Sequence, residues 1–411
     1  MTLEPVTVTT RPDHNVAPRR FSVTVLACAA FAMFISLSAL AQDVKVVRIA
    51  TGPIDTTEFP FGGLIGNAIS NPPGSRECDR GGNCGVPGLI ANSQTTDGAY
   101  HNLLAIVRGD IDLALSQADV ANWAFYSIGD FENKEPLTRV RIVARLYPST
   151  IHLLARKGAK ITSVKDLAGK RVSVDGEGTA TRFTVKAVLA AFGVTSTSVR
   201  MQTLDVTAAT TALKDGKIDA MFLVSGAPVL ALEDLSRTAP FELIPISGPT
   251  AEKLTHAFPF YSLGTIPANT YGEHPEIQTV AVGTVLVARD DLDDELGFGI
   301  ANAIWHERNK ALFEAGHARG KLMDPKLAAH GLGVPMQTGA GRYYISKGLM
   351  IPPPAIAPAE PSKPLPARSA PRAATPAPAT QTPAPVIPSP APIPAPPTEP
   401  AETPTTGSST P

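Results

Sequence analysis

The 411-residue sequence is poor in cysteine, tryptophan and net charge: it has three cysteines, two tryptophans and a formal net charge of −1. The near-neutral charge argues against a nucleic-acid-binding protein and gives no basic patch for a membrane surface. The eight histidines are scattered, and His306-Glu307 lacks the second histidine of a metalloprotease helix. No Gly-x-Ser-x-Gly elbow or Walker loop occurs. The sequence therefore predicts no enzyme, no catalytic residue, no metal and no cofactor.

An N-terminal leader is indicated by Arg11, Arg19 and Arg20, which precede an apolar run at residues 21–40. Cleavage after the small residue Ala41 would remove residues 1–41 as a signal peptide and leave a periplasmic protein. The apolar run is long for a signal. An uncleaved helix that tethers the protein to the inner membrane is therefore the alternative.

Two cysteines remain after the leader, because Cys28 lies within it. Cys78 and Cys84 lie in a glycine-rich loop, with five residues between them. In an oxidising compartment this spacing favours a small disulfide-closed loop. The alternative is a metal site, but two cysteines without a nearby histidine or second cysteine pair supply too few ligands.

Proline is concentrated at the C-terminus, where more than half of the 40 prolines follow residue 351. Residues 350–411 are rich in Pro, Ala, Thr and Ser and contain few large apolar residues. Such a segment buries too little surface to fold, so we predict a disordered tail with polyproline character. It is either a spacer that contacts the envelope or a tolerated low-complexity extension.

Strand, polar turn and helix follow one another three times between residues 48 and 126. The predicted strands are residues 48–51, 89–94 and 111–115, and the predicted helices are residues 62–70, 99–107 and 120–126. Consecutive units of this kind build a parallel sheet. Ligands of such sheets bind beyond the carboxyl ends of the strands, next to the helix N-termini. We therefore expect the three turns to converge on one crevice.

A second series begins at residue 170. We predict strands at residues 170–174 and 220–224 and helices at 183–192 and 207–213, preceded by two strands at 140–146 and 151–156. Further strands are predicted at 241–246 and 280–288, and a long helix at 294–313. Two such series predict two lobes that face each other across a cleft. We place lobe I at residues 42–154 and 285–349, and lobe II at residues 155–284.

Several segments resemble the TAXI subfamily of solute receptors, which serve TRAP transporters. They are the first turn from Thr51-Gly52 to Gly62, RGDIDLALSQADVANWA, LYPSTIHLLAR, VSVDGEGTATR and FPFYSLGTIPANTY. The motifs occur in the family's order and extend over roughly residues 46–348.

The resemblance implies a type II periplasmic-binding-protein fold: two α/β lobes, a hinge and an interlobe ligand cleft. It also implies a small organic acid or acidic amino acid as ligand, a TRAP permease as membrane partner, and a monomer that needs no cofactor. An envelope sensor or scaffold, whose tail contacts partners, is the alternative function.

The candidate ligand-binding residues follow the predicted strands. Arg182 is the candidate cation for a ligand carboxylate, because a guanidinium offers two parallel donors; the alternative is a surface salt bridge. Phe59 and Tyr147 are candidates for the pocket wall or for the core. The other candidates supply hydroxyl, amide or backbone groups: Thr51, Gly52, Thr56, Thr57, Thr95, Gln117, Thr179, Thr181 and Ser225.

The first turn departs from the family pattern, because Asp55-Thr56-Thr57-Glu58-Phe59 replaces a Gly-Gly-Thr-Tyr-Tyr segment. Two carboxylates in a closed cleft would repel a carboxylate ligand. Asp55 and Glu58 therefore either point to solvent, which we expect because Asp and Glu are usually exposed, or receive an ammonium group or a cation.

Overall fold

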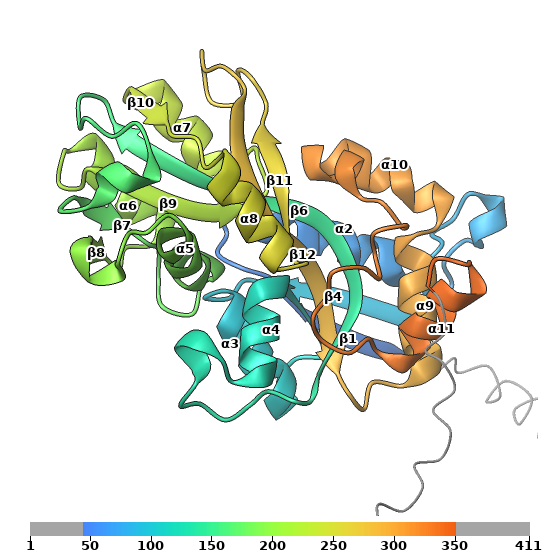
Figure 1. The fold of residues 1–411 in the computed structure, drawn as a ribbon. Helices are drawn as coiled ribbons and strands as arrows, with labels where there is room; N and C mark the ends of the chain where they lie inside the picture. The colour runs from blue at the N-terminus through green and yellow to red at the C-terminus, as the bar shows by residue number, and fades with distance from the viewer. Residues whose placement is uncertain (1–43, 351–411) are drawn as a thin grey trace, which may run out of the picture. The chain divides into compact units, whose positions relative to one another are not determined.

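The computed structural model describes residues 44–350. The predicted leader, its cleavage site and residues 351–411 of the predicted tail lie outside the described residues. Residues 44–350 combine helices with one large sheet, which confirms the predicted α/β class (Figure 1). None of the helices within this part is long and apolar enough to cross a membrane.

Two groups of parallel strands form the two ends of the large sheet. At one end, β1 (Lys45–Ala50) pairs with β4 (Leu89–Gln94) and β5 (Leu113–Gln117). At the other end, β7 (Arg171–Ser173) pairs with β8 (Arg200–Gln202) and β9 (Ala220–Ser225). We call these groups the β1 end and the β7 end. The two predicted series thus occupy opposite ends of one sheet.

Two long antiparallel strands join the ends. β6 (Val140–Arg156) pairs with β9, and β12 (Ile277–Arg289) pairs with β5 and β6. β10 (Phe241–Leu243) adds to β6, and β11 (Tyr261–Ile266) adds to β12. A separate two-stranded sheet contains β2 (Ser70–Asn71) and β3 (Val86–Pro87).

The prediction of two strands over residues 140–156 was wrong, because β6 continues through Pro148. Pro148 faces Gly283 beside an irregularity in the β6–β12 register, and prolines are tolerated at such irregularities. The lobe boundaries at residues 154 and 284 fall inside β6 and β12 and stay predictions.

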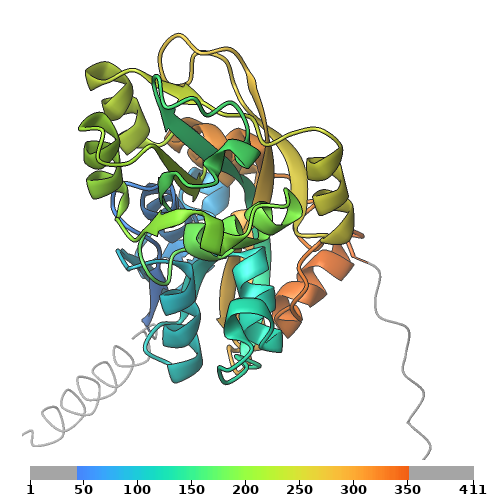
Figure 2. The ribbon, with the colours of Figure 1, turned by 60° about the vertical axis from the view of Figure 1, so that its left-hand side comes forward.

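The helices follow the strands of each end. At the β1 end, α3 and α4 lie side by side in both views (Figures 1 and 2). The α-helices in chain order are α2 (Glu58–Ile69), α3 (Ala99–Arg108), α4 (Ala118–Tyr126), α5 (Ala180–Ala191), α6 (Val206–Lys214), α7 (Leu230–Thr238), α8 (Pro249–Ala257), α9 (Asp294–Ile304), α10 (Glu307–Gly316) and α11 (Thr338–Ser346). Short 3-10 helices are η2 (Cys78–Arg80), η3 (Gly129–Phe131), η4 (Val164–Leu167), η5 (Ser196–Ser198) and η6 (Ala318–Leu322).

The single long helix predicted at residues 294–313 was also wrong, because two helices occupy this segment. His306 starts the second one: its ring Nδ1 accepts a hydrogen bond from the Arg308 N–H (3.3 Å). Asn309 Nδ2 donates to the Ala303 carbonyl (2.7 Å), a group at the end of the first helix. Side chains thus satisfy both helix ends without a proline or glycine, so no usual stop signal is visible in the sequence.

The central strands supply the core. β9 is buried along its whole length, and β12 is buried from Thr279 to Ala288. Near-continuous apolar runs of this kind are typical of strands that are covered on both faces. The turns at the strand ends are therefore held on a rigid support.

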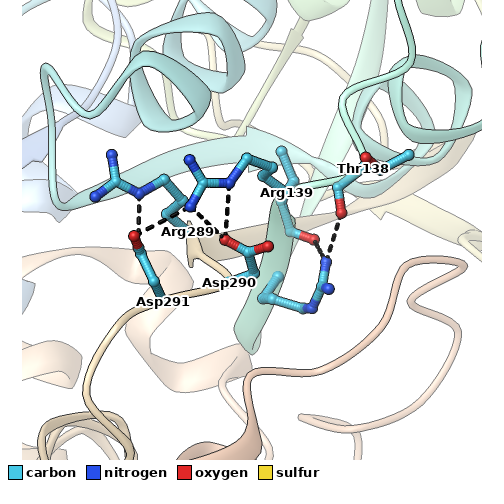
Figure 3. Close-up of polar contacts among 7 residues, drawn as sticks. Thr138, Arg139, Arg289, Asp290 and Asp291 are labelled. Atoms are coloured by element: carbon cyan, nitrogen blue, oxygen red, sulfur yellow. Dashed lines mark hydrogen bonds and ion pairs between the residues drawn. The ribbon is translucent and has the colours of Figure 1, made fainter.

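Exposed ion pairs mark the place where β6 begins and β12 ends (Figure 3). Arg139 Nε lies 3.0 Å from Asp290 Oδ1, and Arg289 Nε lies 2.6 Å from Asp291 Oδ1. The Asp290 N–H also donates to the Arg139 carbonyl (2.8 Å). Because water screens exposed charges, we assign the closure of this junction to the backbone bond rather than to the ion pairs.

Candidate functional site

A small cavity of about 30 Å³ lies where the carboxyl ends of strands from both ends of the sheet meet. The predicted convergence of turns is therefore present, and it includes turns of the β7 end. The lining residues are Thr51, Gly52, Pro53, Thr56, Glu58, Gly98, Ala99, Leu115, Gln117, Asp175, Thr179, Ala180, Thr181, Leu223 and Val224.

The first residue of each surrounding helix faces this cavity. These residues are Glu58 of α2, Ala99 of α3 and Ala180 of α5. At the cavity, α3 and α5 therefore begin with an alanine, whereas α2 begins with the carboxyl group of Glu58. A carboxylate at the first position of a helix is favoured because the N-terminus of a helix carries partial positive charge.

Gly62 allows α2 to approach its own turn. A Cβ atom at Gly62 would lie 2.1 Å from Thr51 Cγ2, so no other residue fits without a shift. This contact fixes the start of α2 against the end of β1. Glu58, one helical turn earlier, is therefore held at the cavity.

Glu58 is buried, with 7% of its surface exposed, and accepts hydrogen bonds from three neutral side chains. Gln117 Nε2 lies 3.1 Å and Ser149 Oγ 3.4 Å from Oε1, and Ser225 Oγ lies 2.9 Å from Oε2. Burial raises the pKa of Glu58, and the hydrogen bond from Ser225 is the largest opposing effect. The expectation that Glu58 points to solvent was wrong, because the close approach of α2 to β1 turns it inward.

Contacts between residues of the two ends surround the cavity. The Thr57 N–H donates to Ser225 Oγ (3.2 Å), and the Thr57 hydroxyl donates to the Gly226 carbonyl. A Cβ atom at Gly226 would lie 2.9 Å from Thr57 Cγ2, so glycine is needed for this approach. On the opposite side, the Tyr100 N–H donates to the Gly178 carbonyl (2.8 Å).

Asp175 is the second carboxyl group of the cavity, and it comes from the β7 end. It is buried, with 6% of its surface exposed, and it adopts a left-handed backbone conformation with φ of 68°. Burial is the main cause that raises the pKa of Asp175 to about 6. No lysine, arginine or histidine is among the residues that line the cavity.

The threonines shape the turns through their hydroxyl groups. Thr51 Oγ1 donates to the Gln94 carbonyl (2.7 Å), and Thr56 Oγ1 donates to the Pro53 carbonyl (2.8 Å). Thr179 Oγ1 donates to the Gly176 carbonyl (2.9 Å), whereas Thr181 Oγ1 accepts from the Val224 N–H (2.9 Å). Of the predicted ligand-binding residues, Thr51, Gly52, Thr56, Gln117, Thr179 and Thr181 line the cavity.

Three predicted residues lie beside the cavity rather than in its lining. Thr57 and Ser225 bind each other across the two ends. Thr95 Oγ1 donates to the Gly52 carbonyl (2.9 Å), and Thr95 lines an outer hollow of about 640 Å³. This outer hollow shares Pro53, Asp175 and Thr179 with the cavity.

The structure places Arg182 outside the lining of this cavity. Its guanidinium lies 3.6 Å from Glu177 Oε1 and donates to Thr203 Oγ1 (2.9 Å) at a different hollow. Arg182 is the third residue of α5, and successive helical residues turn by about 100°. The side chain therefore points away from the cavity that Ala180 faces. Arg182 forms a surface salt bridge, which was the alternative that the sequence offered for this residue.

Phe59 and Tyr147 are also absent from the cavity lining. Tyr147 is buried and packs on Phe61, with ring centroids 4.3 Å apart, so it belongs to the core. Phe59 is half-buried and follows Glu58 in α2, which turns it away from the cavity. The core alternative was therefore correct for Tyr147.

Sequence reasoning did not predict Asp175 as a site residue. Its position directly after a strand, in the turn Asp175-Gly176-Glu177-Gly178, was the signal that could have identified it. Sequence reasoning also missed Arg319, which η6 brings into the interior with 4% of its surface exposed. Arg319 Nη2 donates to Thr150 Oγ1 (3.3 Å), and its Nε has no hydrogen-bond partner among the described residues. No local pattern predicts this, because η6 is distant in sequence from the turns.

The predicted disulfide between Cys78 and Cys84 is present, with the two Sγ atoms 2.00 Å apart. His306 Nε2 lies 3.8 Å from Cys78 Sγ. Thiolates rather than disulfide sulfurs bind metals, so the oxidised loop does not act as a metal site.

Comparisons with known proteins give a family match and several similar solved structures. The sequence profile described as the NMT1-like family matches residues 49–348. Among solved structures, the chain is similar to the periplasmic aliphatic sulphonate binding protein SsuA from Escherichia coli (14% identity, TM-score 0.39, 74% of this chain and 83% of that chain). PhnD1 from Prochlorococcus marinus, in complex with methylphosphonate, gives 14% identity, a TM-score of 0.44 and coverage of 74% and 99%.

A third solved structure is an ancestral arginine-binding protein bound to arginine, with 15% identity, a TM-score of 0.40 and coverage of 66% and 97%. All three TM-scores lie below 0.5 and all three identities are low. The ligands of these proteins therefore say nothing about the ligand of this chain.

Proposed function

The chain belongs to the NMT1-like family, and we propose that it is an extracytoplasmic solute receptor rather than an enzyme. The observation that carries this proposal is the small cavity that is lined by turns from both ends of one sheet. Groups at the carboxyl ends of strands commonly bind small ligands. Its carboxyl, amide and threonine groups include no nucleophile paired with a base among the described residues, so capture without reaction is the simplest use of the site.

The mechanism is closure of the two ends around a solute. The contacts of Thr57 with Ser225 and Gly226, and of Tyr100 with Gly178, form only when the ends are close. A solute that contacts both ends binds the closed form more tightly than the open form, and it shifts the population by that difference in affinity. The closed form would then be recognised by the membrane partner.

The resemblance to TAXI receptors supports two finer parts of the proposal. The solute is a small organic acid or an acidic amino acid, and the partner is a TRAP permease that an ion gradient drives. The protein works in the periplasm after removal of residues 1–41, as a monomer and without a cofactor.

Solute capture is tested by thermal-shift screening of the purified mature chain against amino acids, 2-oxo acids and dicarboxylates, with calorimetry on each hit. We expect at least one of these to raise the melting temperature and to be recovered unchanged. Chemical turnover of a hit would contradict the receptor function.

Delivery is tested in proteoliposomes that contain a TRAP permease encoded beside this gene. We expect uptake of the identified solute to need this protein and an ion gradient but not ATP. Uptake that depends on ATP hydrolysis would exclude the TRAP partner and leave solute capture intact.

A further inference from the structure

The cavity presents two carboxyl groups to whatever enters it. Glu58 comes from the β1 end and Asp175 from the β7 end, and each has more than nine-tenths of its surface buried. Neither residue takes part in a salt bridge among the described residues, and the lining contains no cationic side chain. Arg319 interacts electrostatically with Glu58 from outside the lining, whereas Asp175 has no salt-bridge partner among the described residues. A buried carboxylate without a cationic partner is costly unless a ligand supplies the opposite charge.

Asp175 accepts few hydrogen bonds from the protein. Its Oδ1 accepts from the Gly176 N–H (2.7 Å), and the hydroxyl groups of Thr181 and Thr179 also interact with its carboxyl group. The Thr179 hydroxyl donates to the Gly176 carbonyl. Because Asp175 lines the cavity, its carboxyl group borders the space where a ligand would bind.

Glu58 is held as an acceptor. The Ser225 hydroxyl receives the Thr57 N–H at its oxygen, so its own proton points to Glu58 Oε2. The Gln117 amide can only donate at its nitrogen. A carboxylate oxygen accepts more than one hydrogen bond, so Glu58 retains capacity for a further donor. Arg319 lies nearby in the interior, but it does not line the cavity.

Three of the four threonines that line the cavity also offer only acceptors to a ligand. Thr51, Thr56 and Thr179 each donate their only hydroxyl proton to a backbone carbonyl. What each hydroxyl still offers to a ligand is an oxygen lone pair. A ligand group rich in N–H donors therefore fits this cavity better than a carboxylate does.

The outer hollow repeats this charge pattern. Besides Asp175, it is lined by Asp55, Asp97, Glu177 and Asp205, while His101 is its one basic residue and no lysine or arginine lines it. A concave surface of one charge sign concentrates ligands of the opposite sign. The approach to the cavity therefore favours a cationic group.

We propose that the solute carries a protonated primary amine, which Glu58 and Asp175 bind from opposite ends of the sheet. The inference rests on the proposed receptor function, and it selects the amino acid from the two solute classes named there. An ammonium group is close in size to a water molecule, and the cavity of about 30 Å³ has room for such a group. Because the amine contacts both ends, it stabilises the closed form.

The proposal is tested by calorimetric titration of the mature chain with matched pairs that differ only at the amine. The pairs are L-glutamate with 2-oxoglutarate and L-alanine with pyruvate, and calcium chloride is titrated separately. We expect an amino acid to bind at least about tenfold more tightly than its 2-oxo acid, because a buried hydrogen bond to a charged group is lost with the amine. Equal or tighter binding of the 2-oxo acid, or binding of calcium alone, would overturn the proposal.

Two variants locate the amine. Asp175→Asn and Glu58→Gln keep the side-chain shape and remove the charge, and each is expected to weaken amino-acid binding by about tenfold or more. Asp234→Asn, an exposed carboxyl on α7, is the matched control and should leave binding unchanged. Unchanged affinity in a folded Asp175→Asn variant would contradict the inference. Binding of 2-oxo acids without amino acids removes only this inference, whereas binding of no solute removes the receptor function as well.

Discussion

The turn after β1 and the turn after β7 are built alike but present different residues to the cavity. Both follow a parallel strand, contain threonines that bond to the backbone, and lead into a twelve-residue helix. The first turn sends its carboxyl group inward from the first helical residue, Glu58. The second sends Asp175 inward from the turn itself, while its helix starts with Ala180 and carries Arg182 on the outside.

This difference shows that a charged side chain enters the cleft only if its position along the helix turns it toward the cleft. The presence of a charged residue in the motif does not by itself decide this. Glu58 and Ala180 are first helical residues and both face the cavity, whereas Arg182 is third and faces away. A shift of two residues turns a side chain by about 200°. The arginine of the second turn is thus present in the motif but absent from the cavity.

The largest expected effect tests the Asp175 side of the comparison through pH. The pKa of Asp175 is raised to about 6 in the folded protein from an ordinary value of 3.8. Below about pH 4 Asp175 is protonated in both the folded and the unfolded protein. As the pH rises to about 6, only the folded protein keeps this proton. Stability from this group is therefore lost with rising pH, by up to about 3 kcal/mol.

Asp175→Asn removes this dependence, and asparagine tolerates the left-handed backbone. We expect the variant to gain free energy of unfolding over the wild type between pH 4 and pH 7, as denaturant titrations would measure. A difference between the two proteins that is the same at both pH values would show that Asp175 does not titrate in this range.

The second effect tests the close approach in the first turn. Gly62→Ala brings a methyl group to 2.1 Å from Thr51 Cγ2, and we expect it to lower the free energy of unfolding by about 2 kcal/mol. Gly63→Ala is the matched control, because its new Cβ would meet only Ser93 Oγ, at 3.9 Å. Helix propensity predicts that this control is stabilised by up to about 1 kcal/mol. Equal stability of the two variants would contradict a tight contact between α2 and β1.

The smallest effect tests the outward position of Arg182. Arg182→Ala removes a partly exposed ion pair with Glu177, and such pairs contribute about 0–1 kcal/mol. We expect solute affinity, measured by calorimetry, to stay within about twofold of the wild type, since no direct contact is lost. A large loss of affinity would return Arg182 to the ligand site and reverse the distinction between the two turns.

Much of the fold could be predicted because its signals are local. The strand at residues 89–94 and the helix that starts at Ala99 agree with the prediction, since turn residues bound both segments. The uninterrupted β6 and the break between α9 and α10 could not be predicted, because partners distant in sequence decide them. Pro148 is tolerated through its position opposite Gly283, and His306 ends one helix and starts the next through its own ring.

The sequence by itself determined the α/β class, the converging turns and the small disulfide loop, because each depends on the order and spacing of nearby residues. Only the tertiary structure decided which side chains enter the cavity. Glu58 was expected in solvent and lies inside, whereas Arg182 was a candidate ligand group and lies outside. The physical reason is that burial of a charge depends on how far a helix approaches a strand and on its rotation there. A glycine contact between α2 and β1 fixes both at this site.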